Sequence, residues 1–268
     1  MQEGQAYFVE APTTDRVAGV ARALKLLEII TLGPPEGMNL TELAKKIEIS
    51  KSSTLALLRT MTDAGFVRTR EPGPRYLPGM TLLRLGDLSR TTQPVDEIAQ
   101  VYIPTLAQEI GMTIRVAINE GGRPVFISRA DAPGAIRFHT MLGAKEIPSV
   151  SSAGKAILAN LTDDEIKAVI DETGLPARTK HSHTTLASLM RDINQVRTRG
   201  YAVDDEEDVD GIFCIGAAFF DHTGRCGGAI SATGIKTATR QKRTAYFGAQ
   251  VVKCADAITK ELHGRRVR

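Results

Sequence analysis

One segment of the 268-residue sequence constrains the fold more than any other: residues 39–78, where two helical patterns are followed at once by a hairpin pattern. The first helical pattern ends at Ile47, and the second covers residues 51–64. Residues 66–70 and 75–78 have the composition of strands and are joined by a turn rich in Pro and Gly. Two helices separated by a three-residue turn, with a hairpin directly behind them, predict a winged helix-turn-helix.

The residues at the ends of these patterns favour the same boundaries. Either Asn39 or Thr41 can cap the first helix, and Ser50 can cap the second, because a short polar side chain accepts a hydrogen bond from a free N–H of the first turn. Gly65 ends the second helix. The hairpin therefore follows the second helix with almost no linker, as a wing does.

The rest of the chain divides around this segment. Apolar residues at helical spacing predict another helix over residues 17–32, stopped by a Gly-Pro-Pro sequence. We expect a disordered arm over residues 1–14, the winged helix domain over 15–79, a linker helix over 80–92 and a second domain over 93–268.

The second helix of the helix-turn-helix and the wing carry the residues expected to contact double-stranded operator DNA. Short hydroxyl side chains let a helix approach the major groove closely, and the positive helix N-terminus favours nearby phosphate. Arginines on a wing lie near the sugar-phosphate backbone. Three helices alone are equally consistent with a small helical domain that binds no DNA, and the wing favours DNA binding. The expected contacts are Thr41, Lys51, Ser52, Ser53, Thr54, Arg59, Arg68, Arg70 and Arg75.

The charge distribution limits DNA contact to the ends of the chain. Residues 1–92 hold 12 Lys and Arg against 10 Asp and Glu, residues 93–235 hold 13 against 19, and residues 236–268 hold 9 against 2. The acidic middle would be repelled by nucleic acid. The basic tail at residues 265–268 is interpreted as a solvated terminus.

Composition excludes several other classes of protein. The longest apolar run has nine residues, whereas a membrane-spanning helix needs roughly 20, and the first residues do not resemble a secretory signal. Three cysteines without a CxxC pair argue against a disulfide framework and a zinc ribbon. We therefore expect a cytoplasmic protein that does not contact membranes.

Several motifs resemble the IclR-type transcription regulators, and together they span nearly the whole chain. In the first domain these are Leu40-Thr41-Glu42-Leu43-Ala44, Gly65-Phe66-Val67 and Tyr76-Leu77-Pro78-Gly79; in the second they are Ala153-Gly154-Lys155-Ala156, residues 200–207, residues 211–215 and residues 229–234. One departure concerns Leu55-Ala56, where many members carry a His-Arg pair. A base-reading arginine is therefore missing there.

The second domain is expected to be α+β, with a largely antiparallel sheet. The predicted helices cover residues 95–110, 151–161, 163–171, 186–199 and 239–262, and the predicted strands cover 113–119, 124–130, 136–141, 201–204, 212–220 and 226–232. The resemblance implies a GAF-like effector-binding fold. It also implies that the first helix and the linker helix pair in a homodimer, or in a dimer of dimers, of a repressor.

By the same resemblance, the pocket for a small-molecule effector is formed by Ser152, Ala153, Asp204, Cys214, Ser231 and Thr233. His139 and Met141 share a face of the strand predicted over 136–141 and are expected to complete it. Free backbone N–H groups at a helix start bind carboxylates well, so a small organic or aromatic acid is the expected effector. Ordinary packing is the alternative for each of these residues.

Other signals do not indicate catalysis or a metal. The acidic run over residues 204–210 lacks the spacing of a calcium loop and is interpreted as a solvated loop. His181 and His183 lack a third ligand nearby in the sequence, and Gly154-Lys155 is not a phosphate-binding loop. No catalytic motif and no cofactor site stand out. An enzyme of a small-acid pathway with an appended winged helix is the remaining alternative.

Overall fold

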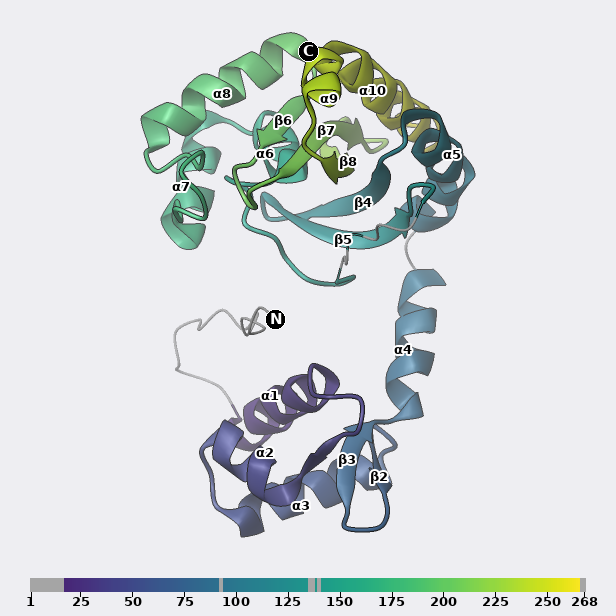
Figure 1. The fold of residues 1–268 in the computed structure, drawn as a ribbon, viewed down its shortest axis with the longest axis vertical. Coiled ribbons are helices and arrows are strands. Elements are labelled where there is room, and N and C mark those ends of the chain that lie inside the picture. Colours follow the sequence, from purple (N-terminus) through teal and green to yellow (C-terminus); the bar gives the residue numbers. More distant parts are fainter. Residues whose placement is uncertain (1–16, 92–93, 135–137, 139–140, 266–268) are drawn as a thin grey trace. The chain divides into compact units, whose positions relative to one another are not determined.

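The computed structural model describes residues 17–91, 94–134, 138 and 141–265. The chain divides into two compact units, Met1–Thr92 and Gln93–Arg268. Each unit is described by itself, with elements labelled as in Figure 1. The arm predicted over residues 1–14 lies outside the described residues.

Three helices and a small sheet form the first unit. The helices α1 (Ala18–Thr31), α2 (Leu40–Ile47) and α3 (Lys51–Asp63) are followed by a hairpin of β2 (Val67–Arg70) and β3 (Arg75–Pro78), then by α4 (Met80–Thr91). A two-residue strand, β1 (Met38–Asn39), pairs with β3. The antiparallel order is β1-β3-β2.

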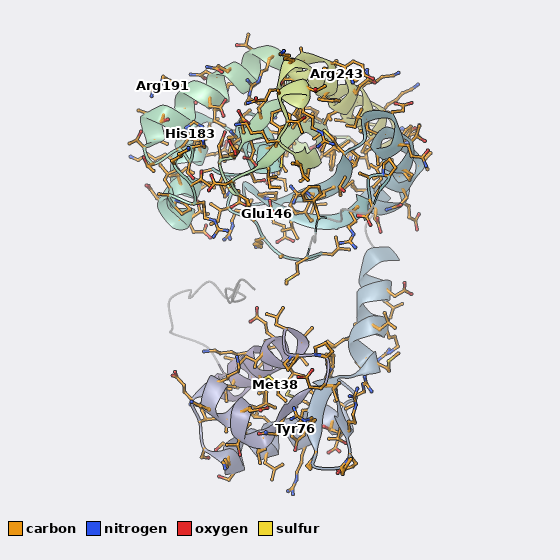
Figure 2. All side chains as sticks on the ribbon, viewed as in Figure 1. Met38, Tyr76, Glu146, His183, Arg191 and Arg243 are labelled. Carbon is orange, nitrogen blue, oxygen red and sulfur yellow. The ribbon has the colours of Figure 1, made fainter. Side chains whose placement is uncertain are left out.

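Apolar side chains from every part of this unit except α4 meet in one core. Leu26 and Leu43 are fully buried in it together with Leu58, which shows that α1, α2 and α3 each turn one apolar stripe inward. Met38 and Tyr76 add the sheet to the same core and are labelled in Figure 2. Because the hairpin and α3 share this core, the position of the hairpin relative to α3 is fixed.

The helix boundaries follow from caps. Asn39, rather than Thr41, caps α2: its side chain accepts from the N–H of Glu42, whose carboxylate accepts from the N–H of Asn39. Ser50 caps α3 by accepting from the N–H of Ser53. Between the helices, Glu48 takes a left-handed conformation with φ of 60°.

A glycine joins the wing to α4. A Cβ atom at Gly79 would lie 2.1 Å from the carbonyl oxygen of Gly65, so no other residue fits without a backbone shift. The N–H of Gly79 also donates to the carbonyl of Phe66. This close approach fixes where α4 leaves the hairpin.

The second unit contains a five-stranded antiparallel sheet with the order β5-β4-β8-β7-β6. Its strands are β4 (Thr113–Glu120), β5 (Arg123–Ala130), β6 (Ala202–Asp205), β7 (Ile212–Phe220) and β8 (Cys226–Ile235). Its helices are α5 (Pro94–Ile110), α6 (Ser152–Leu158), α7 (Asp163–Thr173), α8 (Leu186–Arg199), α9 (Ala238–Lys242) and α10 (Thr244–Glu261).

The two faces of this sheet differ in chemistry. One face presents side chains such as Ile114, Ile215 and Ile230 to α5 and α10, and forms the largest apolar core. Because side chains alternate along a strand, the neighbours of these residues face the other way. That second face is partly covered by α6, which packs on β7 and β8. The polar residues of interest lie there.

Two sequence predictions differ from the structure. The strand predicted over 136–141 is absent at its described residues, Phe138 and Met141, and the rest of that stretch lies outside the described residues. The single helix predicted over 239–262 is two helices, α9 and α10, separated at Arg243. The guanidinium of Arg243 stacks on the ring of Tyr246, 4.4 Å from its centroid.

Among the described residues, no helix combines the length and apolar character that crossing a membrane requires.

Candidate functional site

The first candidate surface is the outward side of α3. Lys51, Ser52, Ser53 and Arg59 are all exposed, whereas Thr54, Leu58 and Met61 of the same helix are buried. The hydroxyl groups of Ser52 and Ser53 lie 3.0 and 2.9 Å from the Oγ of Ser50, beside the helix start. This surface therefore offers hydroxyl groups and two cations to a groove.

Thr54 does not belong to this surface, and its prediction as a DNA contact is wrong. Its side chain is fully buried, and its hydroxyl donates to the carbonyl of Ser50 at 3.0 Å. The residue lies on the inward stripe of α3 with Leu58 and Met61. Its hydroxyl group is used within the first turn of the helix and is not available to DNA.

The wing divides its arginines between solvent and structure. Arg68 and Arg70 are exposed on β2. Arg75 is half-buried and donates from Nη1 to the carbonyl of Gly37 at 2.8 Å, which ties β3 to the segment before β1. Because this hydrogen bond turns Arg75 toward its own unit, we expect a structural role for it in place of the predicted DNA contact. Thr41 is exposed at the start of α2.

The second candidate site lies on the sheet face that carries α6. Strand register places Gly216, Ser231 and Arg115 side by side in one row across β7, β8 and β4. The next row on the same face contains Asp204, Cys214, Thr233 and Thr113. Four residues predicted for the pocket are therefore brought into two adjacent rows.

The start of α6 meets the first row. The Oγ atoms of Ser152 and Ser231 are 3.0 Å apart, and both residues are buried. A Cβ atom at Gly216 would lie 2.5 Å from the carbonyl oxygen of Ser152, so glycine allows α6 to approach the sheet this closely. Ala153 is fully buried beside them.

Arg115 reaches into the same place, although the sequence prediction did not include it. Its Nη2 donates to the Oγ of Ser231 at 3.3 Å, and its Nη1 donates to Oε1 of Glu146 at 3.2 Å. Its guanidinium also lies over the ring of Phe126, 4.3 Å from the centroid. Glu146, labelled in Figure 2, is anchored to the edge of β5 by the hydrogen bond from its N–H to the carbonyl of Pro124.

The second row contains a buried acid and a buried thiol. Burial, and then the neighbouring charge of Glu207, raise the pKa of Asp204 to about 7. Burial, followed by the charge of Asp204, raises the pKa of the Cys214 thiol well above its usual value. The thiol is therefore a neutral side chain near pH 7, and the carboxyl group is close to half protonated.

Lys155, on α6, is buried in an ion cluster directly beside this face. Its Nζ lies 2.7 Å from Oδ2 of Asp192 and 2.5 and 2.6 Å from the two carboxylate oxygens of Glu207. It also donates to the carbonyl of Val203. Although burial opposes ionisation of Asp192, hydrogen bonds from His183 and Lys155 hold its pKa well below the ordinary value.

The acidic run over residues 204–210 is not the solvated loop predicted from the sequence. Asp204 and Glu207 are 4% and 8% exposed, and Oδ1 of Asp204 accepts from the N–H of Glu207 at 2.8 Å. Lys236 pairs with two further acids of the run at its outer side. Nearby cations therefore explain why so many carboxylates lie together.

The same cluster includes a group with metal-ligand chemistry. Ligand atoms of His183, Asp192 and Glu207 all lie within 4.8 Å of one another. The ammonium group of Lys155 already lies against both of these carboxylates, at the distances given above. The group is therefore organised around a lysine cation.

The remaining two predicted pocket residues are Met141 and His139. Met141 is 37% exposed, so in this structure it does not close a buried pocket. His139 lies outside the described residues. The remaining pocket prediction concerns the face shared by α6, β7 and β8.

Comparison with known proteins agrees with both units. The family model for the C-terminal domain of the bacterial transcriptional regulator IclR matches residues 89–260, and the model for the IclR helix-turn-helix domain matches residues 19–71. The chain belongs to the IclR family. The transcriptional repressor IclR of Escherichia coli K12 is 32% identical over 261 residues, which cover 96% of this chain and 94% of that protein.

Solved structures of IclR proteins share the fold. The Thermotoga maritima IclR structure has a TM-score of 0.77 at 25% identity and covers 92% of this chain and 100% of its own. An IclR homologue complexed with 4-hydroxybenzoate, from Microbacterium hydrocarbonoxydans, has a TM-score of 0.75 at 17% identity, with 91% and 99% covered. The predicted family and the predicted α+β fold are confirmed. An IclR-family chain of this kind is a DNA-binding transcription regulator with an effector-binding domain.

Proposed function

We propose that this IclR-family protein is a repressor whose binding to operator DNA changes when a small organic or aromatic acid occupies the α6 face of its second unit. The operon it controls would encode breakdown of that acid, and the protein would act in the cytoplasm. The observation that carries the proposal is the buried polar face itself: hydroxyl groups, a guanidinium and a titrating carboxyl group stand together where packing alone would place apolar side chains.

The DNA-binding part of the proposal rests on α3 and the wing. The exposed residues Lys51, Ser52, Ser53 and Arg59 would enter the major groove, and Arg68 and Arg70 would contact phosphates. No arginine stands at positions 55 and 56, so hydroxyl groups and Arg59 would carry the base contacts. Thr41 would contact the backbone from the start of α2.

The effector part rests on the two polar rows. Ser152, Ser231 and Thr233 would donate hydrogen bonds to an acid, with Ala153 and Cys214 as small apolar walls. The homologue complexed with 4-hydroxybenzoate supports an acid of this size as a ligand of the fold. The ligand of that homologue does not identify the ligand of this chain, which depends on the side chains of its own pocket.

A homodimer, or a dimer of dimers, is part of the same proposal. The exposed side of α1 carries Val20 and Leu24, and α4 carries Met80, Leu83 and Leu88, each at least 49% exposed. Apolar rows of this kind are covered in a stable assembly. A symmetric dimer would match the two halves of a palindromic operator.

Fluorescence anisotropy with DNA from the promoter region beside the gene tests the proposal. We expect nanomolar binding at low salt and a steep loss of affinity as salt is raised. Adding small carboxylic acids should shift the binding curve. Absence of binding to any such fragment at low ionic strength contradicts the proposal, and turnover of the acids would favour the enzyme alternative.

A further inference from the structure

Two residues of the α6 face, Thr233 and Arg115, carry a buried side-chain polar atom without a hydrogen-bond partner in the described part of the chain, and of the two only Arg115 is charged. Its Nε atom is buried and has no hydrogen-bond partner there. A buried donor without a partner costs free energy comparable to a lost hydrogen bond, so it indicates a missing group. The side chain is only 12% exposed.

The open position lies along one edge of the guanidinium group. In arginine, Nε–H and one N–H of Nη2 point the same way, and this edge fits the two oxygens of a carboxylate. Nη2 of Arg115 makes only the 3.3 Å contact with the hydroxyl of Ser231, at the long end of the hydrogen-bond range. A carboxylate on this edge would also meet Ser231 and its neighbour Ser152.

The other contacts of Arg115 hold the group without blocking that edge. Glu146 approaches Nη1 at 3.2 Å and is itself 31% exposed. Phe126 supports the flat side of the guanidinium from a buried position. A charged group fixed on two sides in this way is pre-organised for a ligand on the third.

Two other cations near this face, in the part of the chain that the structure describes, have partners of their own. Lys155 is bound by two carboxylates and a carbonyl. Arg129, next to Arg115 in the register, is 37% exposed and lies 3.7 Å from Asp131. Of these three cations, only Arg115 combines a buried guanidinium with an Nε atom that has no partner among the described residues, so it is the one able to supply the charge that an acidic effector requires.

We propose that Arg115 is the specificity-determining residue of the effector site, and that it binds the carboxylate of a small organic acid through its Nε and Nη2 atoms. This inference rests on the proposed function, because it names the group that recognises the effector. Ser152 and Ser231 complete the carboxylate site. Glu146 positions Arg115 and lowers its net attraction for anions.

Calorimetry on the full-length protein tests this with acetate, pyruvate, succinate, benzoate and 4-hydroxybenzoate as probes, each beside its amide. For the acid that binds tightest, we expect Arg115→Gln to weaken binding roughly 10- to 100-fold and to abolish the preference for acid over amide. Arg115→Lys should recover part of the affinity, since a lysine supplies charge without the paired edge.

Two variants separate recognition from loss of structure. Glu146→Gln breaks the ion pair but keeps the guanidinium edge, so we expect equal or several-fold tighter binding of the acid. Arg129→Gln is the matched control on the neighbouring strand and should leave the affinity unchanged.

Equal affinity of the wild type and Arg115→Gln for an acid would overturn the inference and leave the proposed function standing. Loss of binding in Glu146→Gln equal to that in Arg115→Gln would also overturn it, because the ion pair would then be the cause. A wild-type protein that binds none of the five acids contradicts the proposed function itself.

Discussion

At the scale of single residues, burial decides what each charged side chain of the second unit can do. Asp204 and Lys155 are both buried, but their charged neighbours differ. Two carboxylates of opposite charge lie against Lys155, whereas the neighbour that raises the pKa of Asp204 is another acid, Glu207. Charge partners stabilise the ionised form of a buried group, and like charges with desolvation favour the neutral form. Asp204 is therefore the group of the α6 face that titrates near neutral pH.

We predict a pH-dependent cost from Asp204. Its pKa in the folded protein is about 7, above the ordinary 3.8, so between these pH values the folded state binds more protons than the unfolded state. Stability from this group is present below pH 4 and is lost as the pH rises to about 7. Asp204→Asn removes the titration, and its oxygen can still accept from Glu207. In urea unfolding, the free energy of unfolding of the variant should rise relative to that of the wild type by up to about 1.4 kcal/mol per pH unit between pH 4 and 7. A constant difference from pH 4 to 7 would contradict this.

We predict that Lys155→Met destabilises the second unit by about 3–5 kcal/mol, because it leaves Asp192 and Glu207 buried without their cation. Lys236→Met is the matched control. It also removes a lysine from two acids, but its side chain is 22% exposed, so solvent screens the ion pairs and we expect a much smaller loss than for Lys155→Met. Both are measured by urea unfolding followed by circular dichroism. If the two variants lose similar amounts of stability, burial does not determine how much each lysine contributes.

At the scale of elements, sequence reasoning succeeded where the signal is local. Caps and glycines gave the boundaries of α2, α3 and the wing to within about a residue. It failed where register brings distant residues together: Arg115 and Ser231 are 116 positions apart, and Lys155 and Glu207 are 52 apart. Nothing near any of these residues in the sequence marks its partner. Thr54 shows a second limit, within a single helix: the sequence does not distinguish a threonine that is buried from one that faces DNA.

The exposed basic residues of α3 and β2 lead to a prediction about salt. Arg59→Ala and Arg70→Ala should each weaken binding to all DNA sequences and lower the slope of log affinity against log salt by about 0.9. Arg75→Ala is the control, because the hydrogen bond of Arg75 to Gly37 directs it into the unit. Its slope should equal that of the wild type. Anisotropy titrations at several salt concentrations give the three slopes, and an altered slope for Arg75→Ala alone would reverse the assignment.

At the scale of the whole molecule, the proposed dimer concerns the exposed apolar rows of α1 and α4. Leu83 is 66% exposed and Leu24 is 49% exposed. The first unit has one buried core built from α1, α2, α3 and the sheet, and no described residue of α4 belongs to it. In the proposed dimer, a second copy would cover the apolar row of this linker helix.

This leads to a prediction about assembly. Leu83→Glu should shift the protein toward the monomer, because a buried unpaired carboxylate opposes dimerisation. Operator affinity should fall with it, since a monomer binds one half-site and loses the gain from linking two sites. Val101→Glu is the matched control: Val101 is 70% exposed on α5, outside these rows. Light scattering gives the mass of each variant, and anisotropy gives its affinity. If Leu83→Glu remains a dimer while Val101→Glu dissociates, the interface lies on the second unit, and the rows of α1 and α4 do not hold the copies together.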